Sequence, residues 1–109
     1  EGSLVIIGDV NAGAEVIAAD NIAVIGTLRG LAHAGAKGNK EAIIAASTLD
    51  AVQIRISNIV KEFDMNEEYV YDNAYIYADG DQIVIHYLYA ENDSLYSCDT
   101  ELQKKNCTG

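Results

Sequence analysis

The sequence predicts an all-β fold in which short parallel strands wind into a coil. Apolar residues recur at intervals of six, at Leu4, Val10, Val16, Ile22, Leu28 and Ala34. An amphipathic helix repeats about every 3.6 residues and a half-buried strand about every two, so neither produces this period. A period of six is typical of a coil in which each short strand contributes one inward residue before the chain turns a corner.

Matches between residues 18 apart support the coil and give it three sides. Three hexads complete one triangular turn, so Ile7-Gly8-Asp9-Val10 should stack on Ile25-Gly26-Thr27-Leu28, and Ala14 on Ala32. Glycine fits tight corners, and five glycines fall within this stretch, at Gly8, Gly13, Gly26, Gly30 and Gly35. We therefore predict a short three-sided parallel β-helix.

The coil is expected to run from about Leu4 to Val60. The segment Gly35–Lys40 interrupts the hexad and predicts an irregular corner. The repeat resumes at Ala42–Ala45 and closes with Gln53–Ile56, which alternates as a strand does.

The second half of the chain reads differently. Lys61–Asn73 is acidic and predicts a linker or a short helix. Two β-prone runs, Ala74–Tyr77 and Gln82–Tyr87, flank Asp79-Gly80, which is a hairpin signal. We expect three regions: a β-helix domain at 1–63, a linker and hairpin packed on it at 64–90, and a polar tail without an assigned role at 91–109.

All seven tyrosines lie in the range from Tyr69 to Tyr96. They could form an interface, because tyrosine combines a large contact area with a polar tip. We favour packing of the hairpin over the open end of the coil, since terminal turns of a solenoid need a cap or a partner.

Composition excludes several classes of function. The chain has 109 residues, enough for one domain, and a formal net charge of −10. Such a charge disfavours nucleic acid and direct adsorption to an anionic membrane. We find neither a membrane-spanning run nor a signal peptide, and a first residue other than Met suggests a fragment of a longer chain. Cys98 and Cys107 could form a bridge, although free cytosolic thiols are preferred.

The residues offer no catalytic, metal or cofactor site. His33 and His86 are the only histidines, and neither lies near other ligands at metal-binding spacing. His33 is expected to be a surface or stacking residue. We therefore predict that the chain is not an enzyme.

Polar residues beside the inward hexad positions should face outward. Asn11 and Arg29 are one 18-residue turn apart, so their backbones should be neighbours at strand spacing of about 5 Å. They could form a surface ladder or belong to a face that receives a protein partner. An exposed Arg beside Gly30 would be free to pair with a partner's carboxylate.

The runs Gly8–Glu15, Gly26–Gly30 and Ala32–Ala36 resemble the C-terminal domain of the MinC septum-site-determining proteins, and the likeness extends from Leu4 to Val60. The resemblance implies a right-handed β-helix that dimerises and binds the ATP-bound, membrane-associated ATPase MinD. It also implies a role in blocking assembly of the tubulin-like protein FtsZ at wrong division sites. The domain would then be cytoplasmic and reach the inner face of the cell membrane only through MinD.

The resemblance, together with the outward placement, implies a partner-binding set made up of Asp9, Asn11, Gly13, Glu15, Arg29 and Gly30. The sequence departs from the family at Leu31, where many members carry Arg, and at Ala19 and Ala23, where many carry Asp and His. It also begins after an Arg-Ser-Gly-Gln motif that helps to hold MinD. The remaining surface is more apolar than is usual in the family.

A homodimer is expected because a thin apolar coil can pair one face with its own copy. Val5, Ile7, Val24 and Ile25 lie in apolar runs where some side chains must point outward, and they are candidates for that face. Two other classes remain open. One is a structural, polymer-forming β-helix of the bactofilin type that does not bind MinD. The other, a hexapeptide-repeat acyltransferase, fits poorly because it needs a longer coil and a catalytic histidine.

Overall fold

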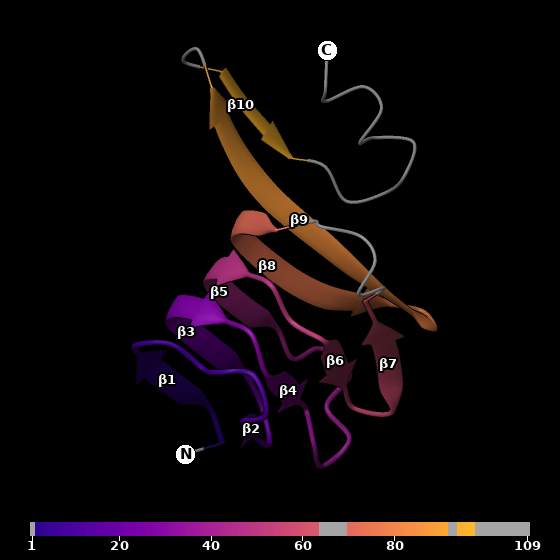
Figure 1. The fold of residues 1–109 in the computed structure, drawn as a ribbon. Coiled ribbons are helices and arrows are strands. Elements are labelled where there is room, and N and C mark those ends of the chain that lie inside the picture. Colours follow the sequence, from indigo (N-terminus) through magenta and orange to yellow (C-terminus); the bar gives the residue numbers. More distant parts are fainter. Residues whose placement is uncertain (1, 64–69, 92–93, 98–109) are drawn as a thin grey trace.

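The computed structural model describes residues 2–63, 70–91 and 94–97, and within them it contains strands and turns but no helix (Figure 1). The all-β prediction is confirmed. The strands are β1 (Leu4–Ile7), β2 (Glu15–Ile17), β3 (Ile22–Leu28), β4 (Leu31–Ala34), β5 (Ile44–Leu49), β6 (Gln53–Ile56), β7 (Ile59–Glu62), β8 (Tyr71–Asp79), β9 (Gln82–Glu91) and β10 (Ser94–Ser97).

The strands form two mixed sheets. The large sheet has the order β1-β3-β5-β8-β9-β10 and the small sheet has the order β2-β4-β6-β7. The pairs β1–β3–β5 and β2–β4–β6 are parallel, whereas every pair that involves β7, β8, β9 or β10 is antiparallel. From β1 to β6 the chain alternates between the two sheets, so each successive pair of strands adds one strand to the large sheet and one to the small sheet.

The core lies between the two sheets. One inward row of the large sheet crosses five strands in register, and its members are Leu4, Ile22, Ile44, Ile76 and Ile85. From the small sheet, Ala32, Ile54 and Ile56 are fully buried. Successive residues of a strand point to opposite faces, so the intervening residues of both sheets face outward.

The predicted inward hexad is largely correct. Val10, Ile22, Leu28 and Ala34 are buried, and Val16 packs against the core while partly exposed. Leu4 is the exception, since it is 40% exposed. It lies on β1, the edge strand of the large sheet, so no further strand covers that side.

The predicted 18-residue offset holds on only part of the coil. It is observed for Leu4 opposite Ile22 and for Val10 opposite Leu28. On the small sheet, however, Val16 pairs with Ala32, an offset of 16, so the predicted alignment of Ala14 with Ala32 is wrong. The corner at residues 11–14 is two residues longer than the corner that follows Leu28, and the excess forms a turn.

The irregular corner predicted at residues 35–40 is confirmed. These residues lie in a turn region between β4 and β5, and the offset between paired strands rises to 22, as in Ile22 opposite Ile44. The extra residues are thereby accommodated outside the core.

The C-terminal hairpin is confirmed, with a correction to its ends. β8 and β9 pair from Ala74–Tyr87 to Asp79–Gln82, and Gly80, at a φ of 65°, begins the two-residue turn. The predicted linker or helix at Lys61–Asn73 is wrong at both ends, because Lys61 belongs to β7 and residues 71–73 belong to β8. Residues 64–69 lie outside the described residues.

The tail is also structured in part, since β10 pairs with β9. Cys98 and Cys107 lie outside the described residues. The predicted packing of tyrosines over the coil is confirmed for Tyr71, which is buried, and for Tyr87, whose ring centroid lies 4.8 Å from that of Tyr71.

Truncation of a core side chain should lower stability without changing the fold. Leu28 is fully buried at the bridge to Val10, so Leu28→Ala leaves a cavity and should cost about 2–5 kcal/mol of unfolding free energy. Urea denaturation followed by circular dichroism measures this. A loss below about 1 kcal/mol would contradict the inward placement of Leu28.

Candidate partner-binding surface

The long corner between β1 and β2 presents a glycine to solvent. The Ala14 N–H donates to the Asn11 carbonyl at 2.9 Å and closes the turn. Gly13 has a φ of 90°, in a region that favours glycine, and a Cβ built on it would meet no atom within 4 Å. A side chain at this position would therefore project away from the coil.

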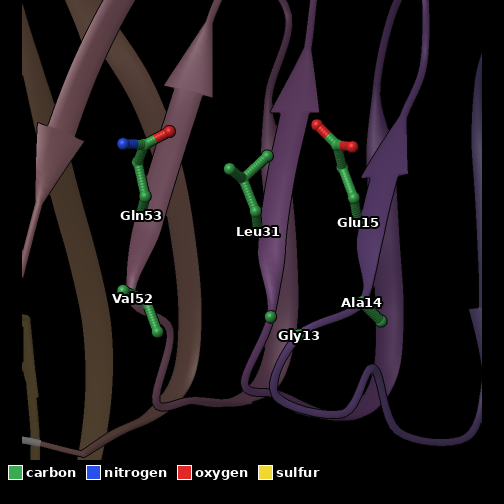
Figure 2. Close-up of a pocket in the computed structure, with 7 residues that line it drawn as sticks. Gly13, Ala14, Glu15, Leu31, Val52 and Gln53 are labelled. Carbon is green, nitrogen blue, oxygen red and sulfur yellow. The ribbon is translucent and has the colours of Figure 1, made fainter.

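Beside this turn the small sheet forms a shallow hollow of about 390 Å³ (Figure 2). Its lining residues, which we call the Gly13 hollow, are Gly13, Ala14, Glu15, Gly30, Leu31, Val52 and Gln53. Glu15, Leu31 and Gln53 are paired across β2, β4 and β6, and their side chains lie side by side on the outer face of the sheet (Figure 2).

Gly30 is fixed as glycine by packing. A Cβ at this position would lie 2.3 Å from the Ala14 carbonyl oxygen and 2.7 Å from that of Asn11. The N–H groups of Arg29 and Gly30 both approach the Val10 carbonyl oxygen, at 2.8 and 3.2 Å. Because Gly13 and Gly30 have no side chains, the end of the hollow next to the corners before β2 and β4 stays open.

The rest of the hollow combines apolar and polar groups. Val52 is 48% exposed and Leu31 is partly exposed, so both offer apolar surface. The exposed Glu15 carboxylate borders one side. On the other side the Gln53 amide donates to the Glu62 carboxylate at 3.2 Å.

The structure separates the six predicted site residues into two groups. Gly13, Glu15 and Gly30 line the hollow, whereas Asp9, Asn11 and Arg29 do not. The Asp9 carboxylate accepts the Thr27 N–H at 2.8 Å, and so it braces a corner between successive turns. Asn11 and Arg29 have exposed side chains on the same corners, next to residues of the hollow.

The sequence analysis missed four residues of the hollow: Ala14, Leu31, Val52 and Gln53. The sequence marks Leu31 only as a departure from the family, and its motifs do not lead to Val52 or Gln53. Val52 and Gln53 line the hollow because the 22-residue offset between β4 and β6 places Gln53 opposite Leu31. The available sequence signal for this part of the hollow was Val52, an apolar residue directly before the alternating strand Gln53–Ile56.

A second surface is the outer face of the large sheet. One row crosses five strands in register, through Val5, Ala23, Ala45, Tyr75 and His86. With their outward neighbours they make up what we call the outer face: Val5, Ile7, Ala23, Ile25, Ile43, Ala45, Tyr75, Tyr77, His86 and Leu88. None of these ten residues is an Asp, Glu, Lys or Arg, whereas Asp72 and Asp79, near the two ends of β8, also point outward on this sheet.

Of the four residues predicted as candidates for a dimer face, three lie on this surface. Val5, Ile7 and Ile25 are exposed. Val24 is only 2% exposed and points into the core, so it is not part of this face.

Within the described residues, no group of three or more His, Cys, Asp or Glu side chains is placed to hold a metal ion. In the same part of the chain, no helix is long and apolar enough to span a membrane. His33 is partly buried, and its Nε2 lies 2.9 Å from the Ser57 carbonyl oxygen, so its ring contributes to packing between turns.

Known proteins share both the sequence and the fold. The family described as septum formation inhibitor MinC, C-terminal domain, matches residues 1–88. Probable septum site-determining proteins MinC are similar to the chain. That of Geobacillus thermodenitrificans is 47% identical over 88 residues, and that of Caldanaerobacter subterraneus subsp. tengcongensis is 59% identical over 69 residues.

A solved structure described as the MinC:MinD cell division protein complex of Aquifex aeolicus has the same fold. The TM-score is 0.77 at 27% sequence identity, over 99% of this chain and 84% of the other.

The matches cover 78% of this chain for the Geobacillus protein and 63% for the Caldanaerobacter protein, but only 38% and 32% of those two proteins. The chain thus spans about a third of the length of these relatives. The family is one of division inhibitors, in agreement with the prediction that the chain is not an enzyme. This chain belongs to the family of MinC C-terminal domains, the septum formation inhibitors.

Proposed function

We propose that this chain is the dimerising and partner-docking domain of a division inhibitor, and that it binds ATP-loaded MinD through the Gly13 hollow. Family membership and the likeness to a structure described as a MinC:MinD complex support a MinD partner. The observation that carries the site is the hollow itself, where Gly13, Glu15 and Gly30 meet apolar surface from two further turns.

We further propose that the coil is a right-handed, three-sided parallel β-helix formed by residues 1–63, with the linker and hairpin of residues 64–90 packed on it and a polar tail at 91–109. The alternation of β1 to β6 between two sheets supports two of the sides. The parallel bridge between Val10 and Leu28, and the Asp50 N–H donating to the Leu28 carbonyl at 2.9 Å, support a short third side.

Homodimerisation would use the outer face. Two chains of net charge −10 repel each other, so a stable contact needs a surface without like charges. The outer face meets this condition and exposes several large apolar side chains. A two-fold pair formed in this way leaves the Gly13 hollow of each protomer free, because the hollow lies on the other sheet.

In this proposal the partner fills the hollow with an apolar side chain and pairs a carboxylate with Arg29. The Arg29 side chain is exposed and forms no ion pair with the described residues, so its guanidinium is available for bidentate contacts. MinD brings the domain from the cytoplasm to the inner face of the cell membrane, and the domain itself does not touch lipid. The longer protein then prevents FtsZ from assembling a septum at the wrong site.

Co-sedimentation with MinD, ATP and anionic lipid vesicles tests the proposal. The chain should pellet with vesicles only when MinD and ATP are both present, and Arg29→Glu should pellet less while keeping its circular dichroism spectrum. If the chain stays in the supernatant under all conditions but forms long polymers by itself, the alternative of a structural β-helix without MinD binding would be supported.

A further inference from the structure

The sequence contains only two arginines, Arg29 and Arg55, and both lie next to the Gly13 hollow. Leu31 and Gln53 line the hollow and are paired across the parallel strands β4 and β6. Arg29 precedes Leu31 by two residues, and Arg55 follows Gln53 by two, which is about 7 Å further along the strand. The two arginines therefore lie on opposite sides of this pair.

Arg55 belongs to the outward face of the small sheet. Pairing between strands places it between His33 on β4 and Val60 on β7, and Ile17 on β2 follows His33 in the same row. Ile17 is 52% exposed and Val60 is 42% exposed, so this row is open to a partner. We call this row and the row beside it the small-sheet face, whose members are Glu15, Ile17, Leu31, His33, Gln53, Arg55, Val60 and Glu62.

The guanidinium of Arg55 has no acceptor among the described residues. Its Nε is buried, and none of those residues accepts a hydrogen bond from it. His33 does not help, because its Nε2 lies 2.9 Å from the Ser57 carbonyl oxygen. The carboxylate of Glu62, on the adjoining strand, accepts from the Gln53 amide instead. A buried donor without an acceptor costs stability, and such exceptions are expected at functional sites.

The rest of the guanidinium is accessible to a partner. Arg55 as a whole is only partly buried, and Nε is the single atom of its side chain that is both buried and without a partner in the described part of the chain. Its stem therefore packs on the sheet while the charged end reaches the surface.

We propose that Arg55 is a second anchor for MinD, and that the partner presents two carboxylates, one to Arg29 and one to Arg55, on either side of the group that fills the hollow. This inference rests on the docking proposed above. A guanidinium binds a carboxylate through two parallel hydrogen bonds, and exclusion of water on docking strengthens such a pair. Glu15 and Glu62 on the same face repel an acid placed elsewhere, so charge also fixes the register of the partner.

Arg55→Met separates the charge from the packing of the stem. Methionine keeps a long, unbranched apolar side chain between His33 and Val60 and removes the unsatisfied Nε. At equal protein concentration, the variant should therefore resist urea at least as well as the wild type. Its dissociation constant for ATP-loaded MinD should nevertheless rise about tenfold or more in biolayer interferometry. Arg55→Lys keeps the charge but loses the forked donor group, so its affinity should lie between the two.

Ionic strength provides a second measurement that a packing role would not affect. Between about 0.05 and about 0.3 M salt, the affinity of the wild type for MinD should fall more steeply than that of Arg55→Met. Lys61→Gln is the matched control, because it removes one positive charge from the adjoining strand β7. Lys61 points away from the small-sheet face and lies 5.4 Å from the centroid of the Phe63 ring. Lys61→Gln should keep the wild-type affinity and salt dependence.

The outcomes separate this inference from the proposed function. If Arg29→Glu binds MinD weakly but Arg55→Met binds as tightly as the wild type, the role of Arg55 is overturned and the Gly13 hollow remains. Weaker binding of Arg55→Met together with an equal loss of urea resistance would assign Arg55 to packing and would also overturn the inference. A wild-type chain that does not bind ATP-loaded MinD would contradict the proposed function, and this inference with it.

Discussion

Gly13→Asp should abolish binding to ATP-loaded MinD while the coil stays folded. A side chain at position 13 meets no atom of the chain, so it would enter the space that the partner has to occupy. The new carboxylate would also lie beside Glu15 and become buried without a counterion on docking. We expect affinity to fall at least about tenfold, and about a hundredfold if docking is close. Biolayer interferometry with immobilised MinD measures the change.

A glycine elsewhere in the chain separates docking from backbone strain. Gly38 has a φ of 109°, and a Cβ built on it, like one on Gly13, would meet no atom within 4 Å. It lies in the loop between β4 and β5, outside the hollow. Gly38→Asp should lose about as much unfolding free energy as Gly13→Asp, about 1–2 kcal/mol, and should keep its affinity for MinD. Equal affinity for MinD in both variants would place the docking surface away from Gly13.

Ile25→Glu should convert the dimer to a monomer. Ile25 is 56% exposed and lies on the outer face opposite Ile7 of β1, so the substitution costs little in the free chain. In a two-fold dimer it brings one extra carboxylate from each protomer into an apolar contact. We expect the dissociation constant to rise at least about a hundredfold. Sedimentation velocity at micromolar concentration should then show a single species of monomer mass.

Ile17 offers a control of the same size and charge change. It is 52% exposed, but it lies on β2 in the small sheet. Ile17→Glu should sediment as the wild type does. If Ile25→Glu remains dimeric, or if Ile17→Glu alone dissociates, the contact between protomers does not use the outer face.

The sequence predicted the core of the coil better than its corners. The hexad identified Val10, Ile22, Leu28 and Ala34 because a buried side chain must be apolar wherever it occurs along the repeat. It failed at Leu4, whose burial depends on a neighbouring strand that the pattern cannot supply. It also failed at Ala14, because a regular six-residue spacing does not reveal that the corner at residues 11–14 is two residues longer than the corner at residues 29–30.

The same corner explains why the candidate site was predicted only in part. Gly13 and Glu15 follow directly from the motif near the first corner, and Gly30 from the second. Val52 and Gln53 join them only through the register of β6 on β4, which depends on how the chain accommodates residues 35–41. Asp9 was included because it faces outward, but its carboxylate is used within the fold to hold Thr27. A sequence pattern shows that a side chain is polar and outward, but not which hydrogen bond it makes.

Hydrogen–deuterium exchange of the wild-type chain, with and without ATP-loaded MinD, tests the docking site most directly. We predict that MinD slows exchange in peptides that cover residues 13–15, 30–31 and 52–53, because these line the Gly13 hollow. Peptides from β1 and β3 should change little, since these strands lie on the other sheet and the proposed dimer covers their outer face. Binding of MinD that protects β1 and β3 but leaves the three hollow segments unchanged would contradict the proposed site.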